Sequence, residues 1–157
     1  MNHSIIEATY NNAVMGIKES WLNGNSEDWY NYIIQLPVQL KYTYLIVVLE
    51  NQVINGGFDQ YFFNGYGQFA HETIKALAIL GASKKADLLQ DALLMVMDGE
   101  EDEQIFRRNL LSKENGKLFN TDDLYEPLNK IDGAYYLLDK EESLTEKLTQ
   151  FLKYLEN

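Results

Sequence analysis

Helical spacing of apolar residues runs through almost the whole chain and is its strongest constraint on the fold. Near the start, residues three and four positions apart are apolar: Ile6, Tyr10, Ala13, Ile17 and Trp21. The same spacing recurs near the end: Leu144, Leu148, Phe151, Leu152 and Leu155. A helical period of about 3.6 residues places each set on one face of an α-helix. With only two prolines among 157 residues, the chain is predicted to be all-α.

Glycine and capping residues divide this pattern into separate helices. We expect helices at 3–22, after Ser26, at 37–54, 58–64 and 70–81, from Ser83 to about Val96, at 102–112, after Thr121 and after Ser143. No two segments alternate in the way that paired strands do. The prediction is one domain over 1–157 with about seven to nine helices. Residues 1–36 are expected to form an N-terminal helical extension that packs on a core at 37–157.

The charge balance and the lack of cysteine narrow the function classes. Acidic residues number 24 against 13 basic ones, which gives a formal net charge of −11. Such a field repels nucleic-acid phosphates and anionic membranes, and it attracts basic surfaces. The absence of cysteine excludes disulfides and thiolate chemistry. Because neither a secretory signal nor an apolar run of about 20 residues is visible, we expect a cytoplasmic protein that binds neither nucleic acid nor membrane.

Three short motifs begin to match a chemical site, and each of them fails. His71 starts a zinc-protease pattern, but Lys75 stands where the second histidine is required. Residues 65–70 fit the loose dinucleotide fingerprint but follow no predicted strand. The loop from Asp98 lacks the glycine and the glutamate that a calcium-binding EF-hand needs at its sixth and twelfth positions. The sequence therefore predicts no metal, no cofactor, no catalytic residue and no enzymatic activity.

The most unusual segment is Glu50–Gly67, which combines two glycine turns with aromatic and amide side chains. Gly56–Gly57 predicts a tight helix end that brings two helices close together. Phe58 is expected to anchor this corner in the core, and Gln60 is expected to share a face with Asn64. Buried or half-buried amides need hydrogen-bond partners. A rigid helix–turn–helix corner is therefore favoured over a ligand site.

This segment resembles the bacterial DNA-mimic protein family, much of which is described only as a domain of unknown function. The resemblance rests on Glu50, Asn55, Gly56, Gly57, Phe58, Gln60, Phe62, Phe63, Asn64 and Gly67, and weaker similarity extends it over about 40–155. It implies an all-helical fold, in which these residues mainly maintain the structure. It also implies a protein, often a homodimer, whose carboxylates stand in for DNA phosphates and occupy a DNA-binding protein such as a helix-turn-helix regulator.

A mimic of this kind needs dense carboxylates without interleaved lysines, and one stretch satisfies both conditions. The candidate partner-binding patch comprises Asp87, Asp91, Asp98, Glu100, Glu101, Asp102 and Glu103. No basic residue lies between positions 86 and 106, and Asp87 and Asp91 are one helical turn apart. A second acidic group contains Asp122, Asp123 and Glu126. The predicted partner is a protein with a basic surface, such as a DNA-binding regulator.

Two other readings of the sequence stay open. The first is an immunity or adaptor protein that binds its partner through exposed aromatic side chains, for which the candidates are Trp29, Tyr30, Tyr66 and Tyr136. The second is an enzyme with a small polar pocket around Glu50, Asn55, Gln60 and Asn64. The first predicts binding that survives salt, whereas mimicry predicts binding that weakens steeply with salt.

Overall fold

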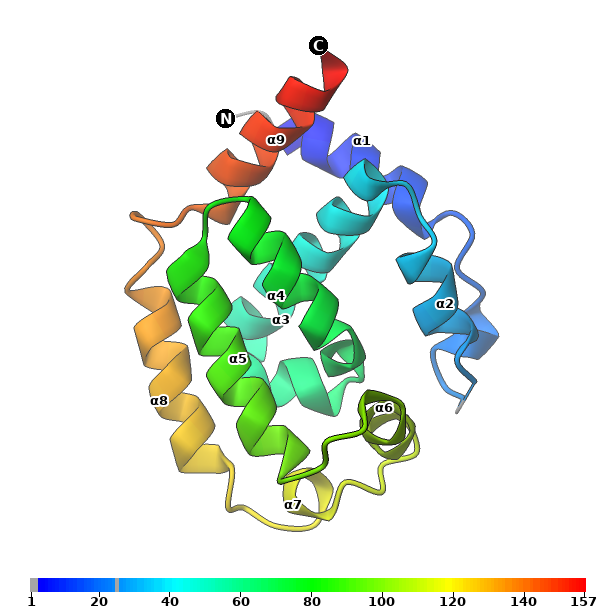
Figure 1. Cartoon of the computed structure of the whole chain (residues 1–157), viewed down its shortest axis with the longest axis vertical. Coiled ribbons are helices and arrows are strands. Elements are labelled where there is room, and N and C mark those ends of the chain that lie inside the picture. The colour runs from blue at the N-terminus through cyan, green and yellow to red at the C-terminus, as the bar shows by residue number, and fades with distance from the viewer. Residues whose placement is uncertain (1–2, 25) are drawn as a thin grey trace.

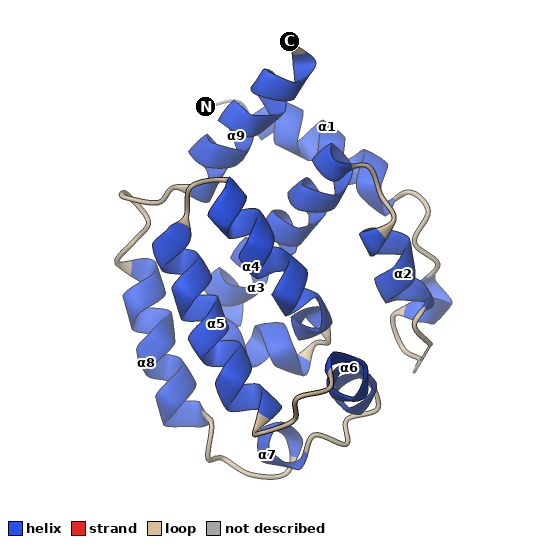
Figure 2. Cartoon of the chain, in the orientation of Figure 1, coloured by secondary structure: helices blue, strands red, loops and turns tan. Residues whose placement is uncertain are grey.

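The fold is all-α, as predicted. The computed structural model describes residues 3–24 and 26–157, and the elements within them contain no strand (Figure 2). They are α1 (His3–Val14), η1 (Glu19–Trp21), α2 (Asp28–Ile34), α3 (Val38–Phe63), η2 (Tyr66–Phe69), α4 (Ala70–Ile79), α5 (Ser83–Met97), α6 (Glu103–Leu111), α7 (Gly116–Phe119), α8 (Tyr125–Tyr136) and α9 (Leu144–Glu156), where η marks a 3-10 helix. No helix among the described residues is both long enough and apolar enough to cross a membrane.

The long helix α3 lies at the centre and contacts α1, α4, α8 and α9 (Figure 1). Its buried side chains include Leu49, Val53 and Phe58, which belong to the main hydrophobic core. The helices α4, α5 and α8 run side by side and add Leu89 and Tyr135 to the same core. Because burial of each large apolar side chain contributes roughly 1.5–3 kcal/mol, α3 carries much of the stabilising contact.

A smaller core joins the N-terminal helices to α3. Trp29 and Ile33 of α2 are buried against Tyr44 of α3 and Phe69 of η2. The Trp29 indole N–H donates to the Tyr44 hydroxyl at 3.0 Å, and its ring packs edge-on against Phe69. The helix α1 contacts α3 and α9. The N-terminal helices are thus packed onto α3 along much of its first half.

The first helix ends at Val14, and the prediction of a helix to residue 22 is wrong. Tyr32 of α2 causes the early end, because its hydroxyl donates to the Ala13 carbonyl at 2.7 Å and accepts from the Gly16 N–H at 3.2 Å. A Cβ atom at Gly16 would lie 2.7 Å from the Tyr32 ring. The chain therefore turns around this tyrosine instead of continuing the helix.

Two boundaries near the C-terminal half also differ from prediction. No helix was expected between residue 112 and Thr121, but Asn115 caps the short helix α7 there by accepting from the Leu118 N–H at 3.2 Å. Its amide nitrogen also donates to the Val96 carbonyl at 2.9 Å, which ties α7 to the end of α5. Thr121 accepts from the Asp123 N–H, and α8 begins only at Tyr125. Both caps are local bonds, and only the additional contact of Asn115 with α5 is one that local spacing does not reveal.

A buried lysine, which the sequence analysis did not single out, joins α5 to α3 and α8. The side chain of Lys85 is fully buried, and its ammonium lies 4.3 Å from the Tyr135 ring centroid. The same ammonium is 3.5 Å from Asp139 Oδ1 and 3.9 Å from Glu50 Oε2. Glu50 in turn accepts a hydrogen bond from the Tyr135 hydroxyl. Lys85 lies one helical turn before Leu89, so the sequence already indicated that it shares the apolar face of this helix.

The first turn of α5 is capped by Glu142, which lies in the loop after α8. Its carboxylate is buried and accepts from the backbone N–H groups of Lys84 at 3.0 Å and Lys85 at 2.8 Å. A carboxylate at a helix N-terminus is stabilised by the free N–H groups and by the helix dipole. The loop after α8 is thereby fixed to the start of α5.

Replacement of Lys85 by alanine should lower the free energy of unfolding by about 3 kcal/mol, because it leaves Glu50 without its buried counter-ion and opens a cavity. The adjacent variant Lys84→Ala is the matched control, since the Lys84 side chain is mostly exposed, and it should change stability little. Urea denaturation at pH 7 compares the two. Equal effects at the two positions would contradict the role assigned to Lys85.

Candidate functional site

The corner predicted at Gly56–Gly57 is a break inside α3. Gly57 has φ 76° and ψ −177°, a backbone conformation that L-residues rarely adopt. The buried N–H of Phe58 donates to Asp132 Oδ1 of α8 at 2.8 Å. A Cβ atom at Gly57 would lie 2.1 Å from the other oxygen of that carboxylate. Glycine is therefore required here both for the left-handed φ and for the close approach of Asp132.

Asp132 acts as a cap supplied from another helix, and its protonation is affected by the same burial. Only 9% of the residue is exposed. Burial raises the pKa of this carboxyl, the hydrogen bond from Phe58 lowers it in part, and the nearby charge of Asp59 raises it again. The site thus holds a carboxylate against a desolvation cost because it satisfies a buried backbone donor.

The amide side chains of the motif bond to one another across the break. Gln60 donates to Gln52 Oε1 and accepts from the Asn55 amide, each at 3.0 Å. Asn64 also donates to Gln52 Oε1 at 3.0 Å, so Gln60 and Asn64 share a face as predicted. Gln52 is the centre of this network, and the sequence analysis did not assign it a role. These bonds link the two halves of α3 and satisfy part of the hydrogen-bonding capacity of these amides.

The polar pocket considered for an enzyme is not formed by its four proposed residues. Glu50 points to Tyr135 and Lys85, whereas Asn55, Gln60 and Asn64 belong to the amide network around Gln52. Among the remaining motif residues, Phe58, Phe62 and Gly67 are buried, and Phe63 is partly exposed. A Cβ atom at Gly67 would lie 2.1 Å from the Phe62 ring. The motif side chains therefore maintain the corner.

The seven carboxylates of the predicted patch lie on α5, in the loop after it and at the start of α6. Asp87 and Asp91 are exposed one turn apart on α5, and Asp98 follows the end of that helix. Asp98 has a left-handed backbone with φ 49°, which turns the chain toward α6. The rest of the patch lies in this loop and at the first position of α6: Glu100, Glu101, Asp102 and Glu103.

Tertiary contacts bring two basic side chains into the patch that sequence spacing had left free of bases. Lys117 lies 3.3 Å from Asp98, and His71 Nδ1 lies 3.4 Å from Glu103. Two further carboxylates serve the local backbone. Asp102 caps α6 by accepting from the Ile105 N–H at 3.0 Å, and Glu100 accepts from the Asp102 N–H at 3.1 Å. The carboxylates without such a contact to the described residues are Asp87, Asp91 and Glu101.

The second acidic group lies at the same end of the molecule as Asp98. The helices α5 and α8 pack together and run in opposite directions, so the C-terminus of α5 and the N-terminus of α8 meet near α7 (Figure 1). Asp122, Asp123 and Glu126 are exposed there. The second acidic group therefore lies at the end of the bundle where α5 ends. Asp98 and Asp122 are 24 positions apart in the sequence, and packing places them at the same end of the molecule.

The expectation that Trp29 is exposed is wrong, since only 2% of it is accessible. Tyr66 packs edge-on against Trp29 and is half-buried. Tyr30 is also half-buried, between Arg107, 3.9 Å from its ring centroid, and Glu72, to which its hydroxyl donates at 2.9 Å. Of the four aromatic candidates, Tyr136 is the exposed one, at 41%. Burial therefore removes Trp29 from the aromatic candidates and retains Tyr136.

Comparison with known families assigns this chain to one protein family. The family model described as DMP19-like protein matches residues 34–155, and the chain belongs to this family. The match runs from the end of α2 into α9, so it includes the broken helix α3 and the acidic patch. It confirms the resemblance at the level of the family. Comparison with curated proteins and with solved structures gives no match.

The two neutral replacements of Asp132 should behave differently. Asp132→Asn keeps an acceptor for the Phe58 N–H and removes a desolvated charge, so stability at pH 7 should be retained or raised. Asp132→Ala leaves that buried N–H unpaired and should cost about 1–3 kcal/mol. Urea denaturation measures both free energies of unfolding, with Asp87→Ala on the exposed face as the control.

The pH dependence follows from the raised pKa of Asp132. The folded protein binds the Asp132 proton more tightly than the unfolded chain does. The charged carboxylate therefore lowers the stability of the wild type at pH 7, and this cost disappears as the pH falls and the carboxyl is protonated. The difference between Asp132→Asn and wild type should therefore shrink when unfolding is repeated in acid. A constant difference at both pH values would contradict the raised pKa of Asp132, and equal stability of the Asn and Ala variants would contradict the assigned cap.

Proposed function

We propose that this protein binds a basic protein partner through the acidic surface of α5 and the loop that follows it. In this proposal the partner is a DNA-binding protein, such as a helix-turn-helix regulator, and the carboxylates occupy the surface that DNA phosphates would otherwise contact. Asp87, Asp91 and Glu101 are the principal contacts. The observation that carries the proposal is that these three exposed carboxylates are not neutralised by any described basic side chain.

Geometry gives the spacing that such a surface presents. Asp87 and Asp98 are eleven residues apart, which corresponds to about 16 Å along a helix that rises about 1.5 Å per residue. One DNA strand carries a phosphate every 3.4 Å or so, hence about five over that length. Asp87 and Asp91 of α5, with Asp98 directly after this helix, are the carboxylates over the same distance. The carboxylates of the following loop and of the α8 N-terminus are needed to approach the density of a phosphate backbone.

The family and the net charge support the same function. The chain belongs to the DMP19-like protein family. Its resemblance to DNA-mimic proteins implies that its carboxylates act as stand-ins for DNA phosphates. A net charge of −11 favours rapid encounter with a basic surface and disfavours direct binding to nucleic acid. We propose that the chain acts by occupancy and without catalysis, since the motif polar groups serve the fold.

The test is capture of a partner from host-cell lysate on the immobilised protein at low salt, with identification by mass spectrometry. A DNA-binding protein should be recovered, and both added duplex DNA and rising salt should displace it. The variant Asp87→Asn/Asp91→Asn/Glu101→Gln should lose this partner. Binding of the purified partner to each bait is then measured by titration at two salt concentrations.

The matched control has the same charge change on another face. Glu7→Gln/Glu146→Gln/Glu156→Gln neutralises three exposed carboxylates on α1 and α9, and it should retain the partner with nearly unchanged affinity. Equal loss with both triple variants would show that total charge, and not this surface, drives binding. Retention by the α5 variant, or a partner that neither salt nor DNA displaces, would overturn the proposal in favour of an adaptor or immunity protein.

A further inference from the structure

Asparagine is followed directly by glycine at four places in the chain, and this dipeptide is open to a spontaneous reaction. The four pairs are Asn23–Gly24, Asn55–Gly56, Asn64–Gly65 and Asn115–Gly116. The backbone nitrogen of the glycine can attack the side-chain carbonyl carbon of the asparagine, because glycine has no Cβ atom to hinder the approach. The reaction needs an amide side chain and a glycine N–H that are not held in hydrogen bonds. The fold therefore decides which of the four pairs reacts.

Two of the pairs lie within α3 and at its end, and hydrogen bonds hold both of them. The Asn55 amide donates to Gln60, and the Asn64 amide donates to Gln52, each at 3.0 Å. Asn55 is also part of the regular helix before the break. The glycine after Asn64 donates its backbone N–H to the Phe62 carbonyl at 3.0 Å. Reaction at either asparagine therefore requires local opening of these bonds first.

The third pair is fixed at the start of α7. Asn115 accepts from the Leu118 N–H through its side-chain oxygen at 3.2 Å. Its amide nitrogen donates to the Val96 carbonyl at 2.9 Å. Both ends of this amide group are thus occupied, and the side chain cannot turn toward the Gly116 nitrogen while the cap of α7 is intact.

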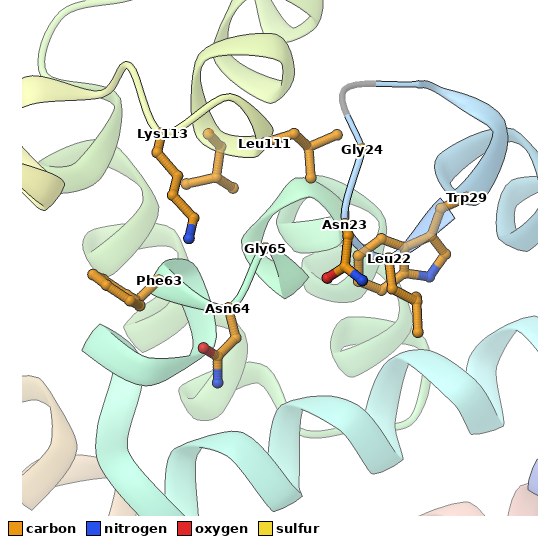
Figure 3. Close-up of a pocket in the computed structure, with 10 residues that line it drawn as sticks. Leu22, Asn23, Gly24, Trp29, Phe63, Asn64, Gly65, Leu111 and Lys113 are labelled. Carbon is orange, nitrogen blue, oxygen red and sulfur yellow. The ribbon is translucent and has the colours of Figure 1, made fainter. Parts of the chain in front are cut away.

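The fourth pair, Asn23–Gly24, has none of these restraints. Asn23 is exposed in a turn of the loop between η1 and α2. Within the part of the chain that the structure describes, neither its amide group nor the Gly24 N–H forms a hydrogen bond. Figure 3 shows the Asn23 side chain extending from this loop at a pocket of about 240 Å³, which residues 63–65 and Lys113 also line. Water therefore reaches the amide of this pair without any opening of the fold.

The fold does not require the glycine of this pair. A Cβ atom at Gly24 would lie 3.5 Å from the Ser20 carbonyl oxygen and 3.9 Å from the Ser26 nitrogen, which are ordinary contacts. Gly24 also has no left-handed φ, whereas Gly65 has a φ of 87°. At Gly56, a Cβ atom would lie 2.0 Å from the Gln60 side chain. Alanine is therefore tolerated at position 24, which allows the reaction to be hindered without a change of fold.

We propose that Asn23 is a site of spontaneous deamidation in the folded protein and that the fold protects the other three pairs. The Gly24 nitrogen loses its proton and bonds to Asn23 Cγ, and the side-chain nitrogen leaves as ammonia. Water then opens the resulting succinimide ring at either carbonyl, which gives aspartate or isoaspartate. Either product makes the protein one unit more negative than −11. The site precedes residues 34–155, so it lies outside the range that the family model matches.

The test follows all four pairs in the folded protein and in the guanidinium-unfolded chain at neutral pH. Samples taken at intervals are digested in mildly acidic buffer, and fragment-ion mass spectrometry distinguishes Asn23 from Asn25 in the same peptide. The four pairs should react at similar rates in the unfolded chain. Folding should leave the Asn23 rate within a few-fold of its unfolded value. It should slow the other three at least about tenfold, which corresponds to about 1.4 kcal/mol of local opening.

Three variants separate the reaction from folding. Gly24→Ala should slow deamidation of Asn23 several-fold at an unchanged melting temperature, since its methyl group hinders the attack and meets only ordinary contacts. Asn23→Gln should remove the acidic isoform that isoelectric focusing detects in aged wild type. Gly116→Ala, whose Cβ atom would also meet only an ordinary contact at 3.7 Å, is the matched control and should leave the Asn23 rate unchanged. An Asn23 rate that folding lowers about tenfold or more, or another pair that reacts as fast in the folded protein, would overturn the assignment.

Discussion

The hydrogen bond from the Phe58 N–H to Asp132 is the contact on which the arrangement of the helices depends. It forms only because Gly57 has no side chain and adopts a left-handed φ, which lets the carboxylate come against the α3 backbone. The bond joins residues 74 positions apart and fixes α8 against the break in α3. The amides around Gln52 then link the two halves of the helix on its outer side.

Buried charge continues this connection to α5. Lys85 lies between Tyr135 of α8, Asp139 and Glu50 of α3, while Glu142 caps the first turn of the same helix. The inner face of α5 is thus fixed by ionic and aromatic contacts as well as by apolar packing. Its outer face carries Asp87 and Asp91 on a rigid support. In the proposed function, carboxylates on a helix that is already fixed lose less entropy on binding than carboxylates on a mobile segment.

The same packing determines which acidic residues are available to a partner. By sequence alone, all seven carboxylates of the patch are equally free of basic neighbours, since no basic residue lies between positions 86 and 106. In the fold, Lys117 and His71 approach two of them, and the backbone uses two others. The remaining three are a narrower and more testable set. Trp29 was expected to be exposed but is buried. Its helical spacing with Ile33 already indicated that both side chains face inward.

The sequence by itself determined the all-α class, most helices, the glycine corner and the acidic stretch, because these follow from short-range spacing, capping and charge. The caps at Asp102 and Ser143 are local in the same sense. Only the tertiary structure decided that Tyr32 ends α1, that Lys85 is buried, and that Lys113 borders a pocket shared with residues 22–24. Each of these depends on groups from different helices that packing brings together, from 16 positions apart upward, and no local pattern encodes such a contact.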